Sequence, residues 1–279
     1  MTSMLSSAVT EIGLGLDSGS TTTKAVVFGN GQILASAITP TLGDIVQAGK
    51  TVLGRVQAEH YYREDKFSRI VTTGSGRTIL ADICSKKFKK IPVKMVTEIT
   101  CHAAGAFYLN PKIRLVVDIG GQDSKVIKIS EMGAVSSFVM NDKCAAGTGR
   151  FFEIMAGALR LELEELVRIA LRARRSVEIT NTCTVFAESE IISHLAAGRS
   201  KSSILLGLHE SIAQRIFSLM RAVGIEKPVA MTGGVANNRA MVREIERRLE
   251  DRILIPQKPE LAGALGAALL AERLNRQYK

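Results

Sequence analysis

Two segments of the chain carry the same pattern of an aspartate, a glycine and a lysine between two apolar runs. They are Leu14–Phe28, with Asp17, Gly19 and Lys24, and Leu115–Ile129, with Asp118, Gly120 and Lys125. The aspartate and the lysine stand seven positions apart in both copies. Each copy predicts a strand, a tight turn and a second strand, and the matched spacing indicates an internal duplication.

The residue types at these turns suit the binding of phosphate. Glycine and small hydroxyl residues let main-chain N–H groups approach an anion, because no bulky side chain blocks them and glycine tolerates positive φ. A carboxylate repels a nearby phosphate unless a divalent cation lies between them, so the pattern predicts a Mg²⁺-nucleotide rather than a bare anion. One such hairpin is a weak signal, but two matched copies favour phosphate binding.

A third segment has the form expected for the adenosine side of a nucleotide site. Residues 228–238 form an apolar run that ends in Gly233 and Gly234, with Asn237 soon after. A helix is predicted over 239–250. Glycines at this place let an adenine or a ribose lie against the backbone. An ordinary strand-to-helix turn capped by asparagine has the same pattern, but the two phosphate hairpins favour the nucleotide interpretation.

These three segments, in this order, resemble the actin-like ATPase superfamily of sugar kinases, Hsp70 chaperones and actin. Five further motifs stand between them, namely Thr72–Arg77, Glu98–Gly105, Asp118–Asp123, Asn141–Phe151 and Thr182–Glu190. They resemble the activators of 2-hydroxyacyl-CoA dehydratases, whose close relatives are the ATP-binding subunits of benzoyl-CoA reductase. The resemblance covers 12–273 and implies an α/β fold of the actin-like (ribonuclease H-like) class, with the nucleotide in a cleft between two duplicated lobes.

The resemblance also implies how the chain is organised. We expect a first lobe over 12–112, a second lobe over 113–258 and a C-terminal helix over 259–279 that returns to the first lobe. Within the second lobe, residues 155–175 alternate apolar and charged side chains at helical spacing, which predicts an amphipathic helix.

By the same resemblance, the site residues divide among the metal, the phosphates and the adenosine of ATP or ADP. Asp17 and Asp118 are expected to bind Mg²⁺ and to position the attacking water, with Gln122 beside them. The phosphates are assigned to Ser18, Gly19, Ser20, Thr21, Lys24, Gly120 and Gly121, and the adenosine to Gly233, Gly234 and Asn237.

Cys144 and Cys183 both precede predicted helices. A helix N-terminus carries partial positive charge and free N–H donors, which favour a thiolate and stabilise an anionic iron–sulfur cluster. Two buried structural cysteines are the alternative. A four-iron cluster takes four thiolates, and the resemblance implies a single [4Fe-4S] cluster shared by two protomers. Cys101 and His102 are assigned to packing, and Cys84, in a basic surface-like stretch, has no assigned role.

The bulk properties fit a globular protein outside the membrane. The 279 residues are 46% hydrophobic, enough to bury a sizeable core. Residues 1–10 lack a signal sequence, and the small apolar run 262–271 is too short to cross a bilayer, so a cytoplasmic location is expected. The net charge of +10 is spread out, except in 86–90 and 168–175. Without a nucleic-acid-binding motif, a solvated or partner-facing basic surface is favoured over DNA binding.

The function implied by the resemblance is ATP-driven transfer of one electron in anaerobic metabolism. A homodimer, or a heterodimer with a paralogue, would accept the electron from ferredoxin or flavodoxin and pass it to a 2-hydroxyacyl-CoA dehydratase. An ATPase subunit of a benzoyl-CoA reductase is the near alternative, and a small-molecule kinase of the actin-like fold is the alternative from another class. A chaperone-like binding module is disfavoured, because the chain ends directly after the ATPase core.

Overall fold

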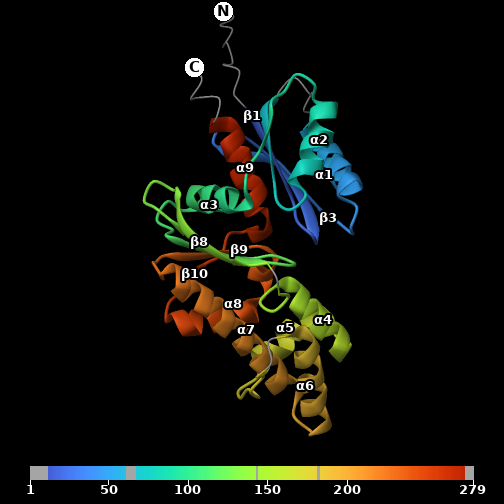
Figure 1. Cartoon of the computed structure of the whole chain (residues 1–279), viewed down its shortest axis with the longest axis vertical. Coiled ribbons are helices and arrows are strands. Elements are labelled where there is room, and N and C mark those ends of the chain that lie inside the picture. Colours follow the sequence, from blue (N-terminus) through green and yellow to red (C-terminus); the bar gives the residue numbers. More distant parts are fainter. Residues whose placement is uncertain (1–11, 61–66, 143, 181–182, 274–279) are drawn as a thin grey trace, which may run out of the picture. The chain divides into compact units, whose positions relative to one another are not determined.

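The structure, a computed structural model, describes residues 12–60, 67–142, 144–180 and 183–273. These residues form two compact units. Unit 1 contains the described parts of Met1–Tyr108 and Leu261–Lys279, and unit 2 contains those of Leu109–Glu260. Each unit has a five-stranded sheet with helices packed against it (Figure 1).

The sheet of unit 1 is built outward from the first hairpin. Strand β1 pairs antiparallel with β2 and parallel with β4. In spatial order the strands are β3 (Gln32–Pro40), β2 (Thr22–Gly29), β1 (Ile12–Ser18), β4 (Phe67–Thr73) and β5 (Val93–Met95). The central strand β1 is buried from its second residue to its last. The turn between β1 and β2 therefore begins at the end of a buried central strand.

Helices cover both faces of this sheet. They are α1 (Ile45–His60) and α2 (Arg77–Lys87) on one face, and α9 (Ala262–Arg273) on the other, with α3 (Glu98–Leu109) beside α9 (Figure 1). Val27 of β2 belongs to the apolar cluster of α1 and α2, whereas Val26 and Phe28 pack with Leu265 of α9. This alternation is the two-residue period of a strand that is buried on both sides.

Cys84 lies inside unit 1. Helix α2 buries Leu80 and Cys84 one turn apart, while Lys86 and Lys87 of the same helix are exposed. The sequence-based placement of Cys84 in a surface-like stretch is therefore wrong, because the run of lysines occupies only the outer side of the helix. Residues 274–279 of the predicted C-terminal helix lie outside the described residues.

Glycines bring the main chain of α9 unusually close to its neighbours. A Cβ on Gly15 of β1 would overlap the carbonyl oxygen of Ala264 in α9. On the side of α3, a Cβ on Gly266 would overlap the carbonyl oxygen of Cys101. Helix α9 is thus packed between a strand and a helix at distances that exclude any side chain at these crossings.

The sheet of unit 2 repeats the strand order of unit 1. In spatial order its strands are β8 (Val135–Asn141), β7 (Ser124–Ile129), β6 (Leu115–Ile119), β9 (Val229–Thr232) and β10 (Ile253–Leu254). In both units the first three strands pair antiparallel, and the first strand pairs parallel with the fourth, which pairs parallel with the fifth. The same topology twice in one chain supports the internal duplication.

The helices of unit 2 lie on one side of its sheet (Figure 1). They are α4 (Gly149–Leu159), α5 (Leu163–Arg172), α6 (Thr184–Ala196), α7 (Lys201–Val223) and α8 (Arg239–Leu249). Two short 3₁₀ segments, η2 (Gly234–Asn237) and η3 (Pro259–Leu261), precede α8 and α9 in the sequence. The amphipathic helix predicted over 155–175 is present as α5, which buries Leu166 and Ala170, but the predicted segment is not one continuous helix. Arg160 adopts the left-handed conformation, with φ of 53°, and ends α4 before α5 begins. Among the described helices, none has the length and apolar character needed to cross a membrane.

A pair of glycine-to-alanine variants tests the close packing of α9. Gly266→Ala places a methyl group on the Cys101 carbonyl and is expected to destabilise the protein by about 2 kcal/mol or more. Gly54→Ala, at an exposed position of α1 with nothing within 4 Å of the new Cβ, is expected to stabilise it by about 0.5–1 kcal/mol. Thermal unfolding followed by circular dichroism measures both. Equal effects of the two substitutions would contradict the packing described.

Candidate functional site

Asp17 and Lys24 form an ion pair across the first hairpin. They lie opposite each other in the antiparallel register of β1 and β2, and Lys24 Nζ donates to Asp17 Oδ2 at 3.1 Å. The Lys24 side chain is 13% exposed and the Asp17 side chain 6%, so water screens the two charges weakly. The hairpin thus holds a carboxylate and a cation directly beside its turn.

Asp118 and Lys125 repeat this arrangement in the second hairpin. They are opposite each other in the register of β6 and β7, with 3.4 Å between Lys125 Nζ and Asp118 Oδ2. Lys125 also pairs with Asp123 at 2.7 Å, and Asp118 Oδ1 accepts a hydrogen bond from Thr232 Oγ1 at 2.9 Å. Each buried charge therefore has more than one partner, as a buried ion pair requires.

A glycine with positive φ stands against each aspartate. Gly74 follows β4 and Gly233 follows β9, with φ of 85° and 82°. A Cβ would lie 2.6 Å from Asp17 Oδ1 if built on Gly74, and 2.9 Å from Asp118 Oδ1 if built on Gly233. Backbone conformation and space both demand glycine at these positions. Gly233, assigned by sequence to the adenosine side, thus also contacts the predicted Mg²⁺ ligand of its unit.

Both turns present main-chain donors. Within the part of the chain that the structure describes, no hydrogen bond to the chain is donated by the N–H groups of Ser20, Thr21, Gly121 and Gln122. The base of the first turn is fixed, because Gly19 O accepts from Thr41 Oγ1 at 2.9 Å and Ser18 O accepts from Gly76 N at 2.9 Å. Open N–H donors on a fixed turn can bind an anion. The Gln122 side chain is exposed at the second turn.

The segment predicted to bind adenosine is held by a buried histidine. Asn238, after the η2 segment that contains Gly234 and Asn237, caps α8 by accepting from Met241 N at 3.0 Å. His209 of α7 lies 2.7 Å from Leu205 O through Nδ1 and 3.0 Å from Asn238 Nδ2 through Nε2. Burial lowers the pKa of His209 to about 4, so the ring is neutral at pH 7. Its Nδ1–H then donates to the carbonyl, and Nε2 accepts from Asn238.

His102 lies against the site, although the sequence indicates only packing for it. It is 6% exposed. A Cβ on Gly263 would lie 2.8 Å from both His102 Nε2 and Asp17 Oδ2. The imidazole and the carboxylate therefore both pack against Gly263. This neighbourhood depends on how α3 and α9 pack. No local sequence signal could have revealed it.

The four cysteines divide into two buried and two accessible thiols. Cys84 and Cys101 are fully buried, and burial raises the pKa of each thiol to about 12. Cys144 is half-buried and Cys183 is exposed, and Cys183 is the N-cap residue directly before α6. Among the described residues, no three His, Cys, Asp or Glu side chains are grouped closely enough to hold a metal ion.

The loop that carries Cys144 is bonded to the second hairpin. Gly149 N donates to Gly120 O at 2.8 Å, and Arg150 N donates to Gly121 O at 2.8 Å. The two donors open α4, and the two acceptors belong to the turn predicted to bind phosphate. Unit 2 thus brings together Asp118, the turn glycines and the Cys144 loop.

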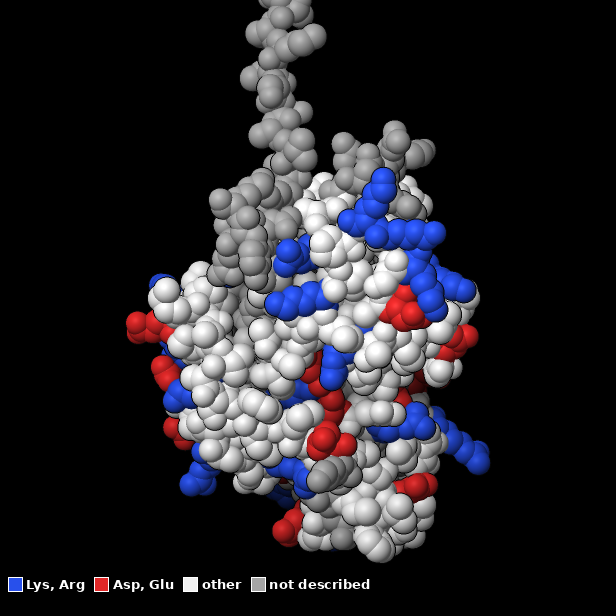
Figure 2. Space-filling model, turned by 45° about the horizontal axis from the view of Figure 1, so that its top comes forward, with Lys and Arg blue, Asp and Glu red and all other residues white. Residues whose placement is uncertain are grey.

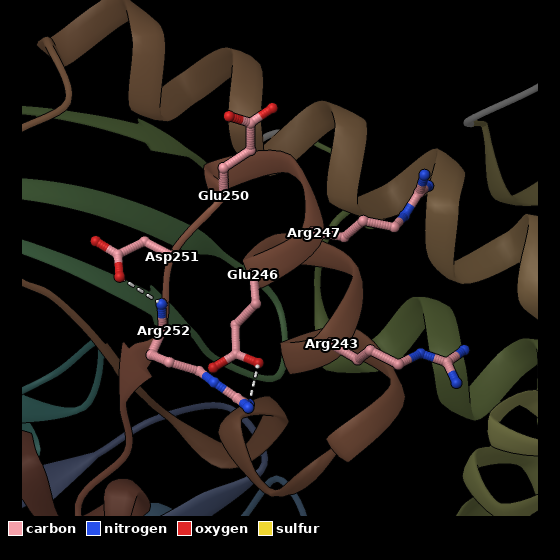
Figure 3. A pocket seen from close by; sticks show the side chains of 6 residues that line it. All are labelled: Arg243, Glu246, Arg247, Glu250, Asp251 and Arg252. Carbon is pink, nitrogen blue, oxygen red and sulfur yellow. Dashed lines mark hydrogen bonds and ion pairs between the residues drawn. The ribbon is translucent and has the colours of Figure 1, made fainter.

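The hollow at the end of α8 is not a further candidate. It measures about 440 Å³ and is lined by Arg243, Glu246, Arg247, Glu250, Asp251 and Arg252 (Figure 3). Three acidic and three basic side chains balance one another there, and Arg252 pairs with Glu246 at 3.4 Å. On the face shown in Figure 2, both basic and acidic side chains are present among uncharged residues.

Comparison with known proteins shows which family the sequence matches. The sequence matches the BadF/BadG/BcrA/BcrD ATPase family over residues 14–271. A 2-hydroxyisocaproyl-CoA dehydratase activator from Clostridioides difficile is 40% identical over 258 residues, which make up 92% of this chain and 94% of the relative.

Two solved structures are similar over nearly the whole chain. The (R)-2-hydroxyglutaryl-CoA dehydratase component A of Acidaminococcus fermentans matches with a TM-score of 0.88 and 37% identity, covering 95% of this chain and 99% of that one. The activator of the 2-hydroxyisocaproyl-CoA dehydratase from Clostridium difficile, with bound ADPNP, matches with a TM-score of 0.84 and 38% identity, covering 96% of each chain. The predicted fold class, an actin-like α/β fold of duplicated units, is confirmed.

Proposed function

Since the chain belongs to the BadF/BadG/BcrA/BcrD ATPase family, we propose that it hydrolyses MgATP to drive one-electron activation of a 2-hydroxyacyl-CoA dehydratase. Relatives named as dehydratase activators, 40% identical to this chain, support the partner class. The observation that carries the nucleotide half of the proposal is the duplicated aspartate–lysine pair beside a turn with open N–H donors. The protein acts in the cytoplasm, where thiols remain reduced.

In this proposal the two hairpins bind the phosphates and the metal. Asp17 and Asp118 take Mg²⁺, for which a carboxylate next to phosphate is the usual protein ligand. The phosphates accept hydrogen bonds from Lys24 and from the open N–H groups of Ser20, Thr21 and Gly121. Ser18, Gly19 and Gly120, also predicted from the sequence to bind phosphate, instead support the turns, because the N–H groups of Gly19 and Gly120 bond Thr22 O and Asp123 O and the Ser18 hydroxyl bonds Thr23. Gln122, exposed beside the second turn, orients the attacking water. Gly233, Gly234 and Asn237 contact the adenosine.

The electron-transfer half of the proposal rests on the two accessible cysteines. Cys144 and Cys183 are the thiols that solvent reaches, so one chain supplies half of the four thiolates of a [4Fe-4S] cluster. A second copy, or a paralogue, related by a two-fold axis supplies the other half. When bound, such a cluster stores and releases one electron. Cys183 is held at the N-terminus of α6, where free N–H donors and the helix dipole favour a thiolate ligand.

Helix α6 also has the apolar surface that a second copy would cover. Val185, Phe186 and Ile192 are 69%, 62% and 54% exposed and lie just after Cys183. Large apolar side chains exposed together mark an interaction surface. We propose that ferredoxin or flavodoxin donates the electron to the dimer, which passes it to the dehydratase.

A substitution of Asp118 tests the nucleotide assignment. Asp118→Asn is expected to lower kcat for ATP hydrolysis by about 100-fold or more, because the amide no longer attracts a cation. The fold is expected to survive, since Lys125 keeps Asp123 as its partner. Glu244→Gln is the matched control. It also neutralises a buried acid in unit 2, one paired with Arg243 and Arg247, and is expected to leave ATP hydrolysis unchanged. Wild-type ATPase rates in Asp118→Asn would refute the assignment.

Iron content tests the cluster assignment. Cys144→Ser and Cys183→Ser are each expected to abolish iron binding after anaerobic reconstitution, because each removes two of the four ligands in a dimer. Cys84→Ala, in the core of unit 1, is expected to keep full iron. Iron and sulfide assays with the dimer mass measure this outcome. One complete cluster per monomer, or full iron in either serine variant, would exclude a shared cluster.

A further inference from the structure

One side chain of β8 bonds two carbonyl groups of the loop between β8 and α4. Asn141, the last residue of β8, donates from Nδ2 to Cys144 O at 3.0 Å and to Ala146 O at 2.8 Å. One amide group thus uses both of its N–H donors on the loop that carries Cys144. Because Asn141 belongs to the sheet, the bonds attach this loop to a strand that also pairs with the second hairpin.

Arg215 fixes the direction of that amide. Its Nη2 donates to Asn141 Oδ1 at 3.4 Å from α7. A guanidinium has only donors, so the oxygen of the Asn141 amide must face Arg215 and the nitrogen must face the loop. The aliphatic part of Arg215 also lies under the loop, since a Cβ on Gly147 would be 3.5 Å from its Cδ.

The far end of the same loop is tied to the phosphate turn. Gly149 N and Arg150 N donate to the carbonyl oxygens of Gly120 and Gly121, each at 2.8 Å. The loop is therefore attached at one end to the turn and at the other to Asn141. Because Asn141 holds the carbonyl groups of Cys144 and Ala146, a shift of the turn has to be absorbed by the short segment from Ala146 to Gly149, two residues from Cys144.

We propose that Asn141, oriented by Arg215, is a positioning residue for Cys144 that makes the Cys144 loop respond to nucleotide bound at the second hairpin. The inference rests on the proposed function, in which that turn binds phosphate and Cys144 is a cluster ligand. It also goes beyond it. All the contacts lie within unit 2, so the response operates in one chain without a cluster and without a second protomer.

Asn141→Asp is the sharpest variant. The substitution keeps the side-chain size and the acceptor for Arg215, but it puts a carboxylate oxygen against two carbonyl oxygens in place of two N–H donors. The matched control is Asn110→Asp. Asn110 Oδ1 accepts from Lys112 N at 2.9 Å on the surface, which an aspartate does equally well.

The rate at which Cys144 is alkylated in the cluster-free protein measures how accessible the Cys144 loop makes this thiol. Iodoacetamide reacts with reduced protein in a Cys183→Ser background, where Cys84 and Cys101 are fully buried and Cys144 is the remaining accessible thiol. Mass spectrometry gives its rate with and without Mg-ADPNP, and calorimetry gives the ADPNP affinity. We expect ADPNP to change the rate in the parent. Asn141→Asp should raise the nucleotide-free rate about fivefold, the effect of one typical hydrogen bond, and abolish the response to ADPNP while keeping its affinity.

The possible results separate a failure of the Asn141 inference from a failure of the proposed nucleotide binding. A parent that binds ADPNP but alkylates Cys144 at the same rate with and without it overturns the inference, as does an Asn141→Asp protein that keeps the parent's response. A parent that does not bind ADPNP contradicts the proposed function instead. Arg215→Met, which removes the donor but retains the aliphatic chain under Gly147, gives a second test. It should weaken the response to ADPNP, and an unchanged response there also contradicts the inference.

Discussion

A buried carboxylate paired across a β-hairpin with a lysine that is buried or largely buried is the interaction on which the rest of the structure depends. Removing two charges from water costs several kcal/mol per ion, and their attraction repays this only with good geometry and further hydrogen bonds. For Asp118 and Lys125 these come from Thr232 and Asp123. Such a pair is a poor means of stabilising a sheet. Its occurrence at the same register position in both sheets is better explained by the proposed role of these charges in binding a ligand.

The surrounding fold follows from the need to hold this pair beside an open turn. The strand carrying each aspartate is central in its sheet, and a glycine with positive φ after the neighbouring parallel strand leaves room for the carboxylate. In unit 1 a further glycine, Gly263 of α9, admits both Asp17 and His102. In unit 2 the turn is bonded to the start of α4, so main-chain hydrogen bonds connect the turn beside the pair to the Cys144 loop.

The sequence predicts correctly those features that depend on the spacing of residues close together in the chain. The hairpins, the aspartate–lysine spacing and the strand–glycine segment at 228–238 are local patterns, and the fold class predicted from them is confirmed. It fails where the outcome depends on packing. The lysines around Cys84 suggested a surface, although that thiol faces the core, and the left-handed conformation of Arg160 divides the helical segment predicted over 155–175 into α4 and α5. Asn141, Arg215 and His102 act through contacts between distant segments, which a single sequence does not reveal.

The central claim is that the two carboxylates bind a magnesium-nucleotide and not a bare anion. Titration calorimetry of the purified protein with ATP, once in excess Mg²⁺ and once in EDTA, tests it most directly. A bare polyphosphate is repelled by Asp17 and Asp118, so we predict binding at least about tenfold weaker in EDTA. Equal affinity in the two buffers would contradict the account, because the aspartates would then have no role in binding the metal.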